Sequence, residues 1–170
     1  MNFIDLVRSR YSVRAYKTDP VEQVKLEQVL EAARLAPTAD NRQAFGLIVI
    51  RTERREKELE RIYSRGWFVQ APLVLCACGI PERAWVRRKD GKNYSDVDMA
   101  VVMDHLVLAA AELGLGTCWV AAFDPGAARE VLRLPAGVEP VAFTPLGYPA
   151  ELPKAKERKA LSELVRYDEW

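Results

Sequence analysis

The chain has 170 residues, of which 49% are hydrophobic and 29% are charged. This length suits one domain with its own hydrophobic core, and the apolar content excludes a wholly disordered chain. The 25 basic and 24 acidic residues leave a net charge of +1, which gives no general attraction for nucleic acid. Any anion must therefore bind at a local cluster of basic residues.

Cysteine content and apolar segments predict a cytoplasmic protein. Cys76, Cys78 and Cys118 are odd in number and contain no Cys-x-x-Cys pair, so they indicate neither a disulfide framework nor a zinc site. The longest apolar segments are shorter than the ~20 residues of a membrane span, and the N-terminal one is too short and charged for a signal peptide. We expect no metal, no membrane and no nucleic acid among the partners.

The first part of the chain predicts two helices and a loop. Asn2 suits the N-cap of a short helix. Asp19 suits the cap of a second helix with Pro20 at its first position, and its apolar periodicity continues until Pro37. The polar residues 37–43 then predict a loop.

The rest of the chain alternates strands with helices. Apolar runs predict strands at residues 45–50, 72–78, 117–123 and 138–146. Helices are predicted at residues 53–64, at 96–113 after a cap by Ser95, and from Asp124-Pro125 to residue 134. Residues 80–94 carry a basic run and predict an exposed loop. This order is typical of an α+β or α/β fold with about four strands.

Two segments present surfaces whose cover the sequence does not identify. The helix at 96–113 is apolar almost all round, so each of its sides needs to be covered by the domain or by a partner chain. Residues 151–170 have little apolar core of their own. Both features are compatible with a homodimer of a single-domain chain spanning residues 1–170.

Two separate basic segments could bind a phosphate group. They are Arg10-x-Ser12-x-Arg14 near the start and Lys154-x-Lys156-x-Arg158-Lys159 near the end. Arginine presents a planar fork that matches phosphate oxygens. Each segment alone also fits a solvated basic surface, and the sequence does not indicate whether the two segments meet.

Other candidate features have a structural interpretation at least as good as a functional one. The small and amide side chains of residues 37–43 could bind a planar heterocycle or simply form a loop. His105 is the single histidine and suits a core or interface position, while no local base accompanies Cys118. Arg87-Arg88-Lys89 beside Trp85 fits a solvated loop better than a site for nucleic acid or a phosphorylated substrate.

Four segments together resemble the FMN-dependent nitroreductase family, and its compact members in particular. They are residues 10–16, 36–43, 93–123 with Gly-Leu-Gly-Thr-Cys-Trp at 114–119, and 145–149 with 156–158. They follow the family's order along nearly the whole chain. The resemblance implies an α+β fold, with a central mixed, mostly antiparallel sheet flanked by helices. It also implies an intertwined homodimer in which a tail of about residues 150–170 wraps the partner subunit.

The resemblance further implies one FMN at each of two sites built by both subunits. By position, Arg10 and Ser12 would hold the FMN phosphate together with Lys156 and Arg158. Tyr11 would lie along the ribityl chain.

The flavin ring would be bordered by three further groups in this resemblance. Arg14 would lie near the N1 and O2 edge, where a cation favours the anionic reduced flavin. The other subunit would contribute Pro37, Thr38, Ala39 and Asn41. Backbone near N5 would come from Val120, Ala121 and Ala122.

The implied function is that of an FMN-dependent oxidoreductase with a ping-pong mechanism. NADH or NADPH would pass a hydride to the flavin, and a small-molecule acceptor would then be reduced, with nitroaromatics, quinones and free flavins as candidates. The flavin carries the chemistry, so no catalytic side chain is required. Two alternatives stay open: a non-catalytic flavin-binding or storage protein, and a family relative with a different flavin reaction.

Overall fold

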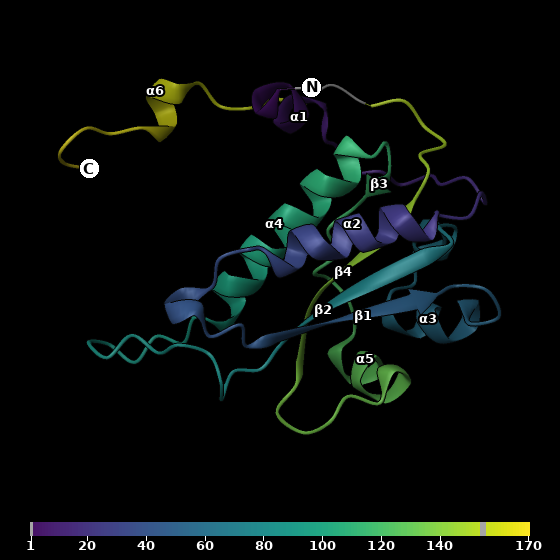
Figure 1. The fold of residues 1–170 in the computed structure, drawn as a ribbon, viewed down its shortest axis with the longest axis horizontal. Helices are drawn as coiled ribbons and strands as arrows, with labels where there is room; N and C mark the ends of the chain where they lie inside the picture. Colours follow the sequence, from purple (N-terminus) through teal and green to yellow (C-terminus); the bar gives the residue numbers. More distant parts are fainter. Residues whose placement is uncertain (1, 154–155) are drawn as a thin grey trace.

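A computed structural model describes residues 2–153 and 156–170 of the chain (Figure 1). Its α-helices are α1 (Phe3–Ser9), α2 (Gln23–Arg34), α3 (Glu56–Ile62), α4 (Ser95–Glu112), α5 (Pro125–Leu132) and α6 (Leu161–Leu164). Short 3-10 helices lie at η1 (Ala39–Asn41) and η2 (Gly66–Val69). The strands are β1 (Phe45–Arg51), β2 (Leu73–Gly79), β3 (Gly116–Thr117) and β4 (Glu139–Gly147).

The described strands form one sheet in the order β1-β2-β4-β3, and every neighbouring pair is antiparallel. β2 is buried along its whole length because it has a strand on each side and helices on both faces. A single parallel bridge joins Ser12 to Thr117 of β3. The predicted α+β fold with a mostly antiparallel sheet is confirmed.

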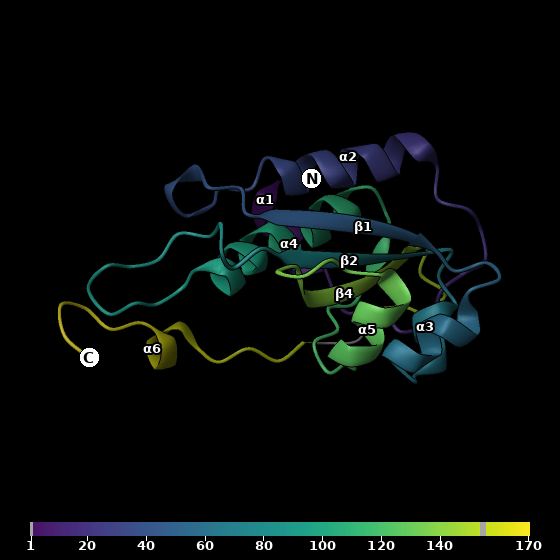
Figure 2. The ribbon, with the colours of Figure 1, turned by 90° about the horizontal axis from the view of Figure 1, so that it is seen from below.

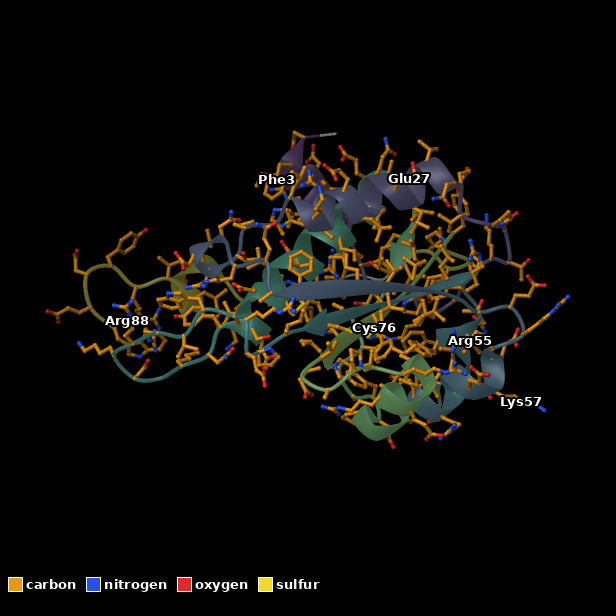
Figure 3. All side chains as sticks on the ribbon, turned by 60° about the horizontal axis from the view of Figure 1, so that its bottom comes forward. Phe3, Glu27, Arg55, Lys57, Cys76 and Arg88 are labelled. Carbon is orange, nitrogen blue, oxygen red and sulfur yellow. The ribbon has the colours of Figure 1, made fainter. Side chains whose placement is uncertain are left out.

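Two apolar clusters hold the layers together (Figure 2). On one face, Val29 of α2 and Met103 of α4 belong to the cluster that contains Leu75 of β2. On the other face, Leu59 of α3 belongs to the cluster that contains Cys76 of β2, labelled in Figure 3. Successive strand residues point to opposite faces, so β2 supplies side chains to both clusters.

Two helix starts predicted from the sequence are wrong. Helix α2 begins at Gln23 and not at Pro20, because the Glu22 carboxylate accepts a hydrogen bond from the Tyr148 hydroxyl at 2.6 Å and holds this segment on the sheet. Ser95 is the first residue of α4 and not its cap. Its hydroxyl oxygen has no hydrogen-bond partner among the described residues.

Two other predicted elements are shorter in the structure. Helix α3 begins only at Glu56, after a turn in which Arg54 has φ of 64°. The strand predicted at 117–123 is reduced to β3, because the Cys118 N–H donates to the Thr144 side-chain oxygen at 3.0 Å and leaves the strand ladder. The chain returns to β4 only at Val120, which bridges to Phe143.

Apolar side chains remain exposed on helices α1 and α4. Helix α2 and the sheet cover much of α4, yet Val97 is 39% exposed. Phe3, Ile4 and Val7 of α1 are more than two-fifths exposed, and α1 contacts α4. The cover that the sequence predicts for α4 is therefore incomplete in one chain. Among the described residues, no helix combines the length and apolar content needed to cross a membrane.

The C-terminal tail extends away from the body of the chain, past α1 in Figure 1. Its α6 stands apart from the other helices in both ribbon views. Leu161 is 77% exposed, Tyr167 is 85% exposed, and Trp170 is fully exposed. Apolar side chains exposed to this extent mark a surface that another chain can cover.

Gly116 allows the segment that follows α1 to lie against β3. A Cβ at this position would lie 2.7 Å from Val13 Cγ2, and the stiff, buried Val13 side chain cannot move aside. We expect Gly116→Ala to lower the free energy of unfolding by about 1–3 kcal/mol in urea titration. Gly46→Ala on β1 is the matched control, since nothing lies within 4 Å of its added Cβ. Equal stability of the two variants would contradict this role of Gly116.

Candidate functional site

The two basic segments of the sequence meet at one cavity. This cavity has a volume of about 310 Å³. The segment after α1 and the tail after β4 line it with Arg10, Tyr11, Ser12, Arg14, Glu151, Leu152, Lys156 and Arg158. All six residues predicted to bind the FMN phosphate, ribityl chain and N1 edge from these two segments are among them. Lys154, from the same basic segment, lies outside the described residues.

Backbone contacts fix the first wall of the cavity. The Val13 N–H donates to the Thr117 carbonyl at 2.9 Å, and Ser12 bridges Thr117, so residues 10–14 continue the edge of the sheet. Val13 is buried, and alternation along an extended chain places Ser12 and Arg14 on the opposite side. This side is the one that lines the cavity.

The tail forms the second wall through side-chain to backbone contacts. The Lys156 ammonium donates to the Arg8 carbonyl at 2.8 Å and also to the Arg10 carbonyl. The Tyr11 hydroxyl donates to the Glu151 carbonyl at 2.8 Å. These contacts hold the start and the end of the chain together around the cavity.

The positive charge around the cavity exceeds the negative charge. Among the described residues, four cationic side chains line it, and Glu151 is the one acidic residue of the lining. Desolvation lowers the pKa of Lys156, and the nearby positive charges of Arg10 and Arg158 lower it further. A bound anion stabilises the charged form of a cation whose pKa is lowered by neighbouring positive charges. The residues present therefore fit a phosphate group.

Cys118 lies beside this cavity but is poorly suited to act as a nucleophile. The side chain is 3% exposed, and burial raises the pKa of its thiol against the opposing effects of Arg14 and Ser12. The thiol is therefore protonated at neutral pH, whereas the thiolate is the reactive form.

Arg14 and Trp67 form a contact that the sequence did not predict. The Arg14 guanidinium lies 5.9 Å from the centre of the Trp67 ring, in a cation–π arrangement. Trp67 comes from η2 and packs edge-to-face on Tyr63 at 5.5 Å. Glu151 is a second unpredicted residue, and its carboxylate accepts from the Arg14 N–H at 2.5 Å. Neither carries a motif signal, since both are brought to Arg14 by tertiary contacts.

The loop that contains Pro37, Thr38, Ala39 and Asn41 is not near this cavity in the same chain. The Ala39 N–H donates to the Asp98 carboxylate at 2.8 Å, in the first turn of α4. The cavity adjoins β3, beyond the other end of α4 (Figure 1). At 1.5 Å per residue, the intervening helix separates the two by roughly 20 Å.

Val120, Ala121 and Ala122 follow Cys118 and do not line the cavity. Val120 is buried, and its N–H donates to the Phe143 carbonyl at 2.8 Å. Ala121 and Ala122 are exposed, and their N–H groups have no acceptor within residues 2–153 and 156–170. These two N–H groups are therefore available to a ligand.

His105 and the acidic residues do not form a metal site in the described part of the chain. His105 is half-buried on α4, and its Nδ1 lies 3.1 Å from the Val101 carbonyl one turn earlier. No group of three or more His, Cys, Asp or Glu side chains suited to a metal ion occurs within residues 2–153 and 156–170.

Comparison with known proteins identifies the class to which this fold and cavity belong. The sequence model of the Nitroreductase family matches residues 7–73 and 60–148, which is most of the chain. The chain therefore belongs to the nitroreductase family. This confirms the family predicted from the four sequence segments.

Particular relatives cover the chain almost completely. A nitroreductase family protein from Clostridium difficile 630 is 41% identical, covers 100% of both chains and has a TM-score of 0.90. An FMN-dependent nitroreductase from Clostridium difficile R20291 is 26% identical, covers 99% of this chain and 100% of that chain, and has a TM-score of 0.83. An FMN reductase (NAD(P)H) from Bacillus subtilis is 29% identical over 93% of this chain and 70% of that protein.

Proposed function

We propose that this chain is an NAD(P)H-dependent oxidoreductase that holds FMN at the cavity between residues 10–14 and the tail. When bound, FMN supplies the redox chemistry: it takes a hydride from NADH or NADPH and, after the oxidised nicotinamide leaves, reduces a nitroaromatic, a quinone or a free flavin. The order of these events makes the mechanism ping-pong. Family membership and the names of the FMN-dependent relatives support this proposal.

The single observation that carries the proposal is the convergence of two basic segments on one positively charged cavity. Arg10, Lys156 and Arg158 offer cationic donors, and the Ser12 hydroxyl adds a neutral one. Together they suit a terminal phosphate with several oxygens. Tyr11 lines the same cavity, where it would border the ribityl chain.

The ring would extend from the phosphate cavity toward Arg14 and the end of β3. A cation at Arg14 stabilises negative charge on the ring by direct electrostatics. The free N–H groups of Ala121 and Ala122 would donate to ring atoms, while the Val120 N–H is used within the sheet. All these contacts hold and orient FMN, and none transfers a proton or attacks the substrate.

The proposed site is completed by a second copy of this chain. Residues 37–41 lie too far from the cavity of their own chain to reach its FMN, so the partner's copy would border the ring. The exposed apolar side chains of α1, α4 and the tail would be buried in the same homodimer. In this proposal, residues 1–170 form one FMN-binding domain, and residues of about 150–170 wrap the partner.

An absorbance spectrum of the purified protein, followed by anaerobic titration with NADH and NADPH, tests this function. We expect a yellow protein that releases FMN on denaturation, loses its flavin absorbance with at least one nicotinamide donor, and recovers it with a quinone. Bound FMN that no nicotinamide reduces would indicate a storage protein. A chain that takes up no added FMN would overturn the proposal.

A further inference from the structure

Residues 80–94 form an arm that the proposed function leaves without a role. The arm leaves the end of β2 and returns at the start of α4, and it projects from the body in Figures 1 and 2. Arg88 marks its outer part in Figure 3. Residues 80–94 carry five arginines or lysines against two acidic residues, Glu82 and Asp90, so the arm has a net charge of +3 in a nearly neutral chain.

The arm is an ordered structure and not a loose loop. Val86 and Asn93 form an antiparallel bridge, and the Tyr94 N–H donates to the Trp85 carbonyl at 3.0 Å. The Trp85 and Tyr94 rings meet edge-to-face at 4.9 Å. The Arg87 guanidinium donates to the Tyr94 hydroxyl at 3.0 Å. These contacts fix the arm before any ligand arrives, which lowers the entropy that binding costs.

A groove of about 830 Å³ separates the arm from the loop that contains η1. Asp40 and Arg42 line it from the loop, and Arg83, Trp85 and Arg88 are among the residues that line it from the arm. One wall of the groove is thus formed by the loop that, in the proposed function, borders the FMN of the partner subunit.

The arginines of this groove differ in their partners. Arg42 pairs with Asp40 at 2.9 Å, so its charge is balanced. The guanidinium groups of Arg83 and Arg88 have no hydrogen-bond or ion-pair partner within residues 2–153 and 156–170. Glu82 is the other acidic residue of the lining, so the groove keeps a net positive charge. Two free guanidinium groups beside an aromatic ring suit a nucleotide that carries phosphates.

We propose that this groove binds the phosphate-bearing half of the reduced nicotinamide dinucleotide, with Arg83 and Arg88 contacting its diphosphate and Trp85 bordering its adenine. This inference rests on the proposed function, because it needs FMN to lie beside residues 37–41. It assigns a role in donor recognition to the arm, which is separate from the residues that hold FMN.

In this proposal, the arm contributes to binding of the donor and takes no part in the transfer of its hydride. The nicotinamide ring alone must reach the flavin, while the diphosphate and adenine are remote from the reacting atoms. Contacts to the diphosphate and adenine have the same strength in the ground state and in the transition state. Their loss therefore raises KM and leaves kcat unchanged. Reduced nicotinamide mononucleotide lacks the adenosine half and is therefore the discriminating probe.

The test uses the FMN-loaded protein and the double variant Arg83→Gln/Arg88→Gln. We expect KM for both NADH and NADPH to rise by about ten- to a hundredfold, because each lost charged contact weakens binding by roughly tenfold. The value of kcat, the KM for reduced nicotinamide mononucleotide and the FMN content stay at wild-type values. Lys57→Gln is the matched control, since it removes an exposed cation from α3 at the far end of the molecule (Figure 3).

Three results would overturn the inference, and they differ from a failure of the proposed function. An unchanged KM for the dinucleotides would show that Arg83 and Arg88 do not contact the donor. An equal rise in KM for the mononucleotide, or the same rise in Lys57→Gln, would show that the effect is not specific to the diphosphate. Wild-type protein that binds no FMN, or whose FMN no nicotinamide reduces, would instead overturn the proposed function and this inference with it.

Discussion

Arg158→Ala is expected to weaken FMN binding by about 10- to 100-fold. The Arg158 guanidinium lines the cavity together with Arg10 and Lys156, and a hydrogen bond to a charged group contributes about 1.5–3 kcal/mol. Titration of FMN into the FMN-free protein, followed by quenching of flavin fluorescence, measures the change. The loss should shrink as the salt concentration rises, because salt screens the attraction between Arg158 and the phosphate, by which the two proteins differ.

Lys159→Ala is the control for this experiment. Lys159 follows Arg158 by one position and is exposed, but it does not line the cavity. Its removal should leave FMN affinity within about twofold of the wild type, as for other solvated surface charges. Equal affinities of the Arg158→Ala and Lys159→Ala variants would contradict the assignment of the tail to the phosphate site.

Removal of residues 160–170 is expected to raise the dissociation constant of the proposed homodimer by at least about a hundredfold. The deleted segment carries exposed apolar side chains, and full burial of each contributes about 1.5–3 kcal/mol. Burial of only two such side chains at the interface accounts for the expected factor. Sedimentation velocity over a range of protein concentrations measures the constant. Lys156 and Arg158 are retained, so the phosphate donors are unchanged.

The body of each chain should stay folded after this deletion. Residues 160–170 contribute nothing to the buried clusters on either face of the sheet, so the midpoint of urea unfolding at low protein concentration should change little. Val24→Ser is a matched control, because Val24 of α2 is 61% exposed and lies outside the proposed interface. A truncated chain that stays dimeric down to nanomolar concentration would contradict a wrapping tail.

Local patterns in the sequence predicted the elements whose stability depends on burial of a regular face. The apolar run of β2 predicted a strand, and the long apolar helix α4 was expected near the centre of the fold. Helix α5 starts at Asp124-Pro125 as predicted, where the Asp124 carboxylate accepts from the Ala127 N–H at 2.9 Å, although the helix ends at Leu132 and not at residue 134. Periodicity and caps act within a few residues, so they can be read without the tertiary structure.

Element boundaries that depend on distant partners were predicted less well. Ser95 was predicted to cap α4, yet it is the first residue of the helix, and the Asp98 carboxylate in the same turn binds the Ala39 N–H of the loop after α2. Glu22 bonds to Tyr148, more than a hundred residues away, and α2 starts later as a result. A polar side chain accepts from whichever donor the fold brings to it, and the local sequence does not identify this donor.

The sequence by itself determined the fold class, the nitroreductase family and the residue types that suit a phosphate. The tertiary structure decided that residues 10–14 and residues 156–158 surround one cavity, and that residues 37–41 lie at the opposite end of α4. Charge and hydrogen-bonding capacity belong to each side chain, whereas their convergence depends on long-range packing of β3, β4 and the tail. The same packing brings Trp67 and Glu151 to Arg14, where no local pattern could have placed them.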